Sequence, residues 1–174
     1  MKNFETTGTV DESVLAELKW QMVPDKQKKL KIALSALLFV LGILYFLYPK
    51  WYLAGSALIV LAVVSVAELL FLPRRYIKMN LANMRESSGC EAYLYTTYFE
   101  EDGIRLFNLT NSGQAKYLYS NIVKVVETQR ILALATKQNQ FVMAFKEGLE
   151  PGEKEELLDL LREKCRKLKV VKVR

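Results

Sequence analysis

The side chains that most often carry out acid–base or metal chemistry are scarce in this chain. It has no histidine among its 174 residues, and its two cysteines, Cys90 and Cys165, do not form a CxxC motif. No glycine-rich phosphate loop occurs, and no serine has a nucleophile-elbow pattern around it. The acidic clusters at residues 100–102 and 153–159 fit a turn and a helix N-terminus. We therefore expect a protein that is not an enzyme, with no catalytic, cofactor-binding or metal-binding residue and no cofactor.

Two apolar runs dominate the first half of the sequence. Residues 32–48 and 51–72 are each about long enough to cross a bilayer as a helix, and only Pro49 and Lys50 separate them. The first run starts too far into the chain for a signal peptide and lacks a small-residue cleavage site. We therefore expect a transmembrane helical hairpin over residues 30–73.

Aromatic and small residues predict how this hairpin is built. Aromatic side chains gather around the turn, as is usual where helix ends meet the membrane interface: Tyr45, Tyr48, Trp51 and Tyr52. Small side chains let two helix backbones approach each other in lipid. The residues that predict such an approach are Ser35, Ala36, Gly42, Gly55, Ala62 and Ser65.

Basic residues concentrate on the two outer flanks of the hairpin. They are Lys26, Lys28, Lys29, Lys31, Arg74, Arg75 and Lys78, whereas the turn carries only Lys50. By the positive-inside rule, this distribution places both termini in the cytoplasm. Anionic lipid at the cytoplasmic face explains much of the net charge of +6, so we do not expect nucleic acid as a partner.

Glu68 is the one acidic residue inside the apolar runs. A carboxylate within a membrane is a candidate proton relay, ion site or partner contact. Only residues 69–72 separate Glu68 from Pro73, Arg74 and Arg75, so it can reach headgroup water or an arginine about one turn away. We prefer this second interpretation, because a lone carboxylate makes a poor transport pathway.

The segment before the hairpin, residues 1–29, shows two local patterns. Residues 4–10 predict a short extended piece, and Asp11 starts a short amphipathic helix with Val14, Leu15, Leu18 and Met22 on one face. Two positions remain open for this helix. It lies at the membrane interface with Trp20, or it packs on the C-terminal domain.

The C-terminal part, residues 80–174, is predicted to form one water-soluble domain. Its hydrophobic period of two predicts strands over residues 92–99, 103–109, 115–119, 122–127, 131–136 and 141–145. A helix is predicted over residues 152–168, with an apolar stripe made by Leu157, Leu158, Leu161, Cys165 and Leu168. This order predicts an α+β fold, in which an antiparallel pleckstrin-homology-like barrel or sheet is capped by the C-terminal helix.

These motifs together resemble the YcxB-like family of bacterial membrane proteins. The resemblance rests on the hairpin, on Glu101-Asp102-Gly103-Ile104, on Tyr119-Ser120-Asn121-Ile122 before a Val-Val-Glu strand, and on residues 141–145 before the capped helix. It implies a two-span protein of the bacterial cytoplasmic membrane with a pleckstrin-homology-like domain on the cytoplasmic side.

Two surfaces of the C-terminal domain are candidates for binding. The basic tail that could contact anionic lipid comprises Lys164, Arg166, Lys167, Lys169, Lys172 and Arg174. Aromatic residues form two rows on opposite faces of the predicted sheet, and one row must be core: Tyr93, Tyr95, Phe99, Tyr117 and Tyr119 on one side, Tyr98 and Phe107 on the other. We expect the first row in the core, and Arg105 beside Phe107 as an exposed contact or a solvated charge.

These features favour a non-enzymatic, membrane-anchored interaction or regulatory module with a protein partner. The alternative is a sensor of anionic lipid or a small ligand at the inner leaflet. Membrane lipids are expected to contact the hairpin and its basic flanks. The sequence does not identify the protein partner, and it leaves a homo-oligomer open.

Overall fold

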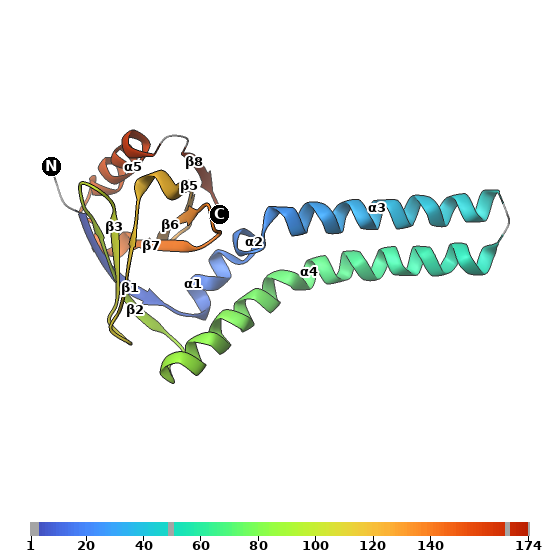
Figure 1. Ribbon diagram of the computed structural model, residues 1–174, viewed down its shortest axis with the longest axis horizontal. Coiled ribbons are helices and arrows are strands. Elements are labelled where there is room, and N and C mark those ends of the chain that lie inside the picture. The colour runs from blue at the N-terminus through green and yellow to red at the C-terminus, as the bar shows by residue number, and fades with distance from the viewer. Residues whose placement is uncertain (1–3, 49–50, 166–167, 174) are drawn as a thin grey trace. The chain divides into compact units, whose positions relative to one another are not determined.

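A computed structural model describes residues 4–48, 51–165 and 168–173 (Figure 1). The chain forms two compact units. The sheet unit combines the residues up to Leu18 with those from Met79 onward, and the hairpin unit comprises Lys19–Lys78. The sheet unit is therefore discontinuous in sequence, because the hairpin is inserted into it. The boundaries predicted at residues 29 and 80 fall inside helices.

The hairpin unit contains three helical segments: α2 (Lys19–Met22), α3 (Asp25–Leu47) and most of α4 (Tyr52–Ser88). Both long helices are long and apolar enough to cross a membrane. Only 11% and 17% of their most apolar windows is buried, so most of these side chains face outward rather than into a protein core. The structure thus supports membrane association through two helices.

Helix α4 continues to Ser88, well beyond residue 73, where the hairpin was predicted to end. It passes through Pro73, whose missing N–H costs one backbone hydrogen bond without ending the helix. The helix closes at Gly89, which has a φ of 69° and donates its N–H to the Arg85 carbonyl at 2.8 Å.

Small residues line the contact between α3 and α4, as predicted. Ser35, Gly42, Gly55, Ala62 and Ser65 are all buried. A Cβ at Gly55 would lie 3.0 Å from the Gly42 carbonyl oxygen and 2.8 Å from Phe46 Cδ2. Only glycine therefore allows the helices to approach this closely. Ala36 was expected at the same contact but is exposed. It comes directly after the buried Ser35 and lies on the outward face of α3.

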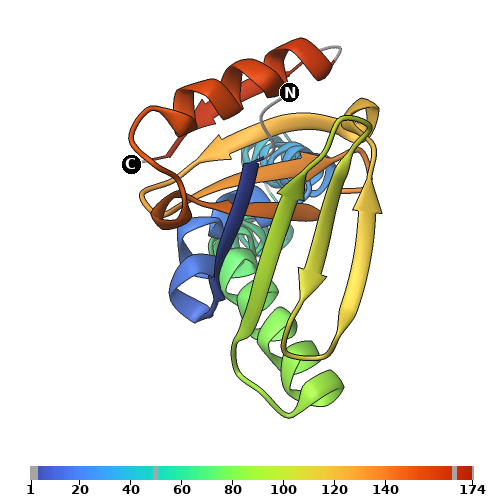
Figure 2. The same cartoon turned by 90° about the vertical axis from the view of Figure 1, so that its left-hand side faces the viewer.

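The first sheet of the sheet unit contains β1 (Phe4–Val10), β2 (Tyr93–Phe99), β3 (Ile104–Asn108) and β4 (Gly113–Tyr117), in that order and antiparallel throughout. Figure 2 shows these strands side by side. β1 pairs with β2 along its whole length, from Phe4 opposite Phe99 to Val10 opposite Tyr93. The extended piece before the hairpin is thus part of the sheet that follows it.

The second sheet has the order β7-β6-β5-β8. It is built from β5 (Ile122–Glu127), β6 (Ile131–Thr136), β7 (Phe141–Phe145) and β8 (Lys169–Lys172), and two short 3-10 turns, η1 (Tyr119–Asn121) and η2 (Lys146–Gly148), flank β5 to β7. β8 runs parallel to β5 and was not predicted. In the described residues the strands form two sheets rather than one closed barrel.

The C-terminal helix α5 (Glu153–Lys164) is shorter than the predicted span of residues 152–168. Cys165 already has extended dihedral angles, and the β-branched Val170 and Val171 favour the strand that follows. The predicted apolar stripe is otherwise present: Leu157 and Leu161 are fully buried, and Leu168 is partly buried against the same core. This core joins residues of both sheets to α5, which confirms the α+β class.

The N-terminal helix α1 (Glu12–Glu17) belongs to the sheet unit. Asp11 caps it by accepting a hydrogen bond from the Val14 N–H at 2.9 Å. Val14 and Leu15 are buried, and the Glu17 carboxylate accepts a 2.8 Å hydrogen bond from Arg130 in the turn between β5 and β6. These contacts support the packed position of α1 over the membrane-interface position.

Candidate functional sites: the basic end of the hairpin and the outer face of the first sheet

The basic flanking residues all lie at one end of the hairpin unit. Lys26, Lys28, Lys29 and Lys31 occupy the first turns of α3, and Arg74, Arg75 and Lys78 lie on α4. A 2.9 Å hydrogen bond from the Tyr76 hydroxyl to the Gln27 side chain shows that these two segments are adjacent. Lys28 is paired with Asp25 at 2.9 Å.

Glu68 forms an ion pair with Lys31 of the opposite helix. The sequence suggested an arginine or headgroup water as its partner, and the structure places a lysine there. Beside this pair lies a cleft of about 410 Å³, which we call the hairpin cleft. Its lining comprises Lys31, Val64, Ala67, Glu68, Phe71, Leu72 and Arg75.

The described residues of the basic tail lie on two different elements. Lys164 ends α5, whereas Lys169 and Lys172 lie on β8. Arg166, Lys167 and Arg174 lie outside the described residues. Lys172 is 3.7 Å from the Glu127 carboxylate, which partly neutralises its charge within the sheet unit.

Glu127 is a nearly buried carboxylate surrounded by lysines. Lys146 lies 3.1 Å and Lys154 3.4 Å from its Oε1. Burial raises the pKa of Glu127, but the hydrogen bond and charge of Lys146, together with Lys154, outweigh burial and lower the pKa overall. The sequence gives no sign of this cluster, because its members lie on separate elements. Both hydrogen bonds go to Oε1, whereas Oε2 is buried without a hydrogen-bond partner among the described residues. The lysine charges around the carboxylate are typical of a structural ion-pair network.

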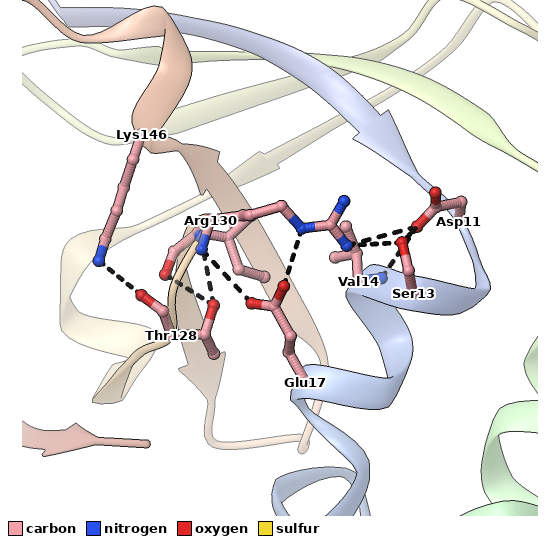
Figure 3. A network of polar contacts seen from close by, with 8 residues as sticks. Asp11, Ser13, Val14, Glu17, Thr128, Arg130 and Lys146 are labelled. Carbon is pink, nitrogen blue, oxygen red and sulfur yellow. Dashed lines mark hydrogen bonds and ion pairs between the residues drawn. The ribbon is translucent and has the colours of Figure 1, made fainter. Parts of the chain in front are cut away.

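A second polar network joins α1 to the turn between β5 and β6 (Figure 3). Besides Glu17, the Arg130 guanidinium contacts the Ser13 hydroxyl at 2.6 Å and the Asp11 carboxylate at 3.7 Å. Burial raises the pKa of Glu17, but hydrogen bonds from Thr128 and Arg130 lower it overall. The network fixes the short helix that leads towards the hairpin.

The aromatic rows have the predicted division between core and surface. Tyr93, Phe99 and Tyr119 are buried. Tyr95 is partly buried, and desolvation raises its pKa to about 12. The first row is therefore the core face of the sheet.

Tyr98, Phe107 and Arg105 form what we call the aromatic–arginine patch, on the opposite face of β2 and β3. The rings of Tyr98 and Phe107 meet edge to face, with centroids 5.6 Å apart and an interplanar angle of 89°. The Arg105 guanidinium lies 6.0 Å from the Phe107 ring and is held by a 2.6 Å ion pair with Glu100. All three side chains of the patch remain partly accessible.

Two observations on the described residues concern metal binding and thiol chemistry. No three histidine, cysteine or acidic side chains among these residues come together as a metal site. Burial raises the pKa of the Cys165 thiol to about 11, which leaves little reactive thiolate near neutral pH.

An α+β sheet unit joined to two helices long enough to cross a membrane defines the structural class of this protein. Within that class, residues 99–161 match the family model described as YcxB-like protein. The matched residues run from the end of β2 into α5, so the resemblance inferred from the sequence is confirmed over most of the sheet unit. The comparisons with curated proteins and with solved structures gave no match.

Proposed function

We propose that this protein is a non-enzymatic, membrane-anchored interaction module. The observation that carries the proposal is the insertion of the apolar hairpin between β1 and β2. Because these strands pair over seven residues, the chain leaves the sheet unit and returns to it on the same side of a membrane. Two covalent connections then keep the sheet unit at the membrane, where its effective concentration for other membrane proteins is high.

The basic end of the hairpin supports an orientation with both termini in the cytoplasm. The flanking lysines and arginines lie on the parts of α3 and α4 that are nearest in sequence to the sheet unit, as the positive-inside rule requires for cytoplasmic segments. The bacterial cytoplasmic membrane is what the resemblance to the YcxB-like family implies, and the match over residues 99–161 supports that resemblance. The succession of a four-stranded sheet, a second sheet and a C-terminal helix supports a pleckstrin-homology-like interpretation of the sheet unit.

The aromatic–arginine patch is the surface we assign to a protein partner. Tyrosine and arginine are enriched among the residues that contribute most to binding in protein interfaces. Glu100 holds Arg105 in place beside Phe107 before any partner arrives, so little side-chain freedom is lost on binding. The patch faces away from the core, which leaves the fold intact when it is occupied.

A photo-crosslinking amino acid at Phe107 tests this proposal in intact cells expressing the full chain. We expect one discrete crosslinked protein, which is lost when Arg105→Ala is added. The matched position is Asp159, an exposed residue on α5. A crosslink to a second copy of the chain would show that the partner is the chain itself, in a homo-oligomer. The same products at both positions, or lipid alone, would contradict the proposal.

The second candidate function is a sensor of anionic lipid or a small ligand. The sheet unit offers it limited support, because Lys116 on β4 is already paired with Asp102 at 2.6 Å. The hairpin cleft supports it better, because it combines cationic and apolar side chains.

A further inference from the structure

The hairpin cleft has a gradient of polarity along α4. Val64, Glu68, Phe71 and Arg75 are spaced by four, three and four residues, which places them on one helix face. At a rise of about 1.5 Å per residue, this face extends about 16 Å from Val64 to Arg75. Its apolar end lies towards the middle of the hairpin, and its charged end lies beside the basic flanks.

The charged end of the cleft carries one positive charge in excess. Lys31 and Arg75 are cationic, and Glu68 balances one of them through its ion pair with Lys31. An ammonium group has three donors and a guanidinium has five, so most of the donors remain available for an anion beyond Glu68. One phosphodiester, with a single negative charge, would neutralise the cluster.

The apolar end of the cleft is open on its outer side. Val64 is 48% exposed and Phe71 60% exposed. If the helices cross a membrane, only lipid or another hairpin can cover these side chains. A second copy would add its own net positive charge, whereas an anionic lipid supplies the opposite charge.

We infer that the hairpin cleft binds one anionic glycerophospholipid. Its phosphate lies between Lys31 and Arg75, and an acyl chain runs along Val64, Ala67 and Phe71. Glu68 holds the Lys31 ammonium at the cleft. This inference rests on the proposed membrane insertion and is independent of partner binding by the sheet unit, so each can fail without the other.

The test is native mass spectrometry of the full chain in detergent, titrated with phosphatidylglycerol or with phosphatidylethanolamine. We expect one phosphatidylglycerol per chain, bound more tightly than phosphatidylethanolamine. Arg75→Gln should weaken binding about fivefold, from about 1 kcal/mol for one basic residue near a membrane surface. Arg74→Gln is the matched control, since it removes the same charge from the preceding residue, which does not line the cleft.

A second pair of variants keeps every charge and changes only the shape of the cleft. Ala67→Trp fills the apolar part and should abolish the one-to-one complex. Val66→Trp adds the same side chain outside the cleft lining and should leave the complex unchanged. Equal losses with Arg75→Gln and Arg74→Gln would overturn the inference. Unchanged binding with Ala67→Trp, or equal affinity for the two lipids, would also overturn it.

Discussion

Gly8 allows a stringent test of the packing of β1 against β7 in the sheet unit. A Cβ at this position would lie 2.2 Å from Phe145 Cδ1 and 2.3 Å from Phe145 Cγ, far inside the roughly 3.5–4.0 Å contact distance of carbon atoms. Phe145 is only 5% exposed, so its ring cannot move aside without disturbing the core. Gly8→Ala therefore forces β1 or β7 to shift.

The magnitude follows from two opposing effects. Overpacking of a well-packed core costs about 1–3 kcal/mol, and the clash at Gly8 belongs in the upper half of this range. Alanine recovers about 0.5–1 kcal/mol, because glycine loses more backbone entropy in a strand. We expect Gly8→Ala to lower the free energy of unfolding by about 1.5 kcal/mol.

The assay is urea unfolding of the full chain in detergent, followed by near-ultraviolet circular dichroism. Phe145→Leu creates space for the new methyl group, so the double variant should recover about 1 kcal/mol relative to the sum of the single changes. Thr9→Ala, at an exposed position on the same strand, is the control. Unchanged stability in Gly8→Ala, or strictly additive effects with Phe145→Leu, would refute the assigned packing of β1.

Three further predictions follow from the hairpin, the buried thiol and the buried carboxylate. Gly55→Leu should separate α3 and α4 and lower the thermal stability of the chain in detergent, whereas Ala36→Leu on the exposed face should not; equal effects would contradict the close approach at Gly55. In the folded protein a maleimide at pH 7 should label Cys90 and leave Cys165 unmodified until urea is added, because Cys165 is buried and its pKa is raised to about 11. Glu127 has a lowered pKa in the folded state, so its contribution to stability is present above the ordinary value of 4.5 and is lost as the pH falls through the folded value. Urea unfolding between pH 3 and 7 should therefore show a shallower acid loss in Glu127→Gln than in the natural chain, and identical pH profiles would contradict the assignment.

Local patterns predicted most elements of this protein. Strands β5, β6 and β7 match the predicted ranges to the residue, because each is a short buried run bounded by turn residues. The hairpin was also predicted, from its two apolar runs. Its second helix continues past Pro73, although a proline removes one backbone hydrogen bond and its ring crowds the carbonyl four residues earlier.

Long-range pairing could not be predicted in the same way. The partner of β1 lies beyond the whole hairpin, and Arg130 meets Glu17 across 113 residues. β8 was not predicted, because its lysines were assigned to a basic tail that follows the helix predicted to end at residue 168. Of the candidate site residues, Glu68 was recognised from its chemistry, but its partner Lys31 follows only from the packing of α3 against α4.

The most direct test of a membrane-anchored module is thiol labelling of intact cells with a membrane-impermeant maleimide. Single cysteines are placed at Thr9 in β1, at Tyr48 beside the hairpin turn and at Asp159 on α5, in a chain whose two natural cysteines are replaced by alanine. The account predicts that the cysteine at position 48 is labelled in intact cells. Those at positions 9 and 159 should be labelled only after the membrane is permeabilised. Labelling of only one of positions 9 and 159 in intact cells would contradict the account. The absence of labelling at all three positions in intact cells would contradict it as well.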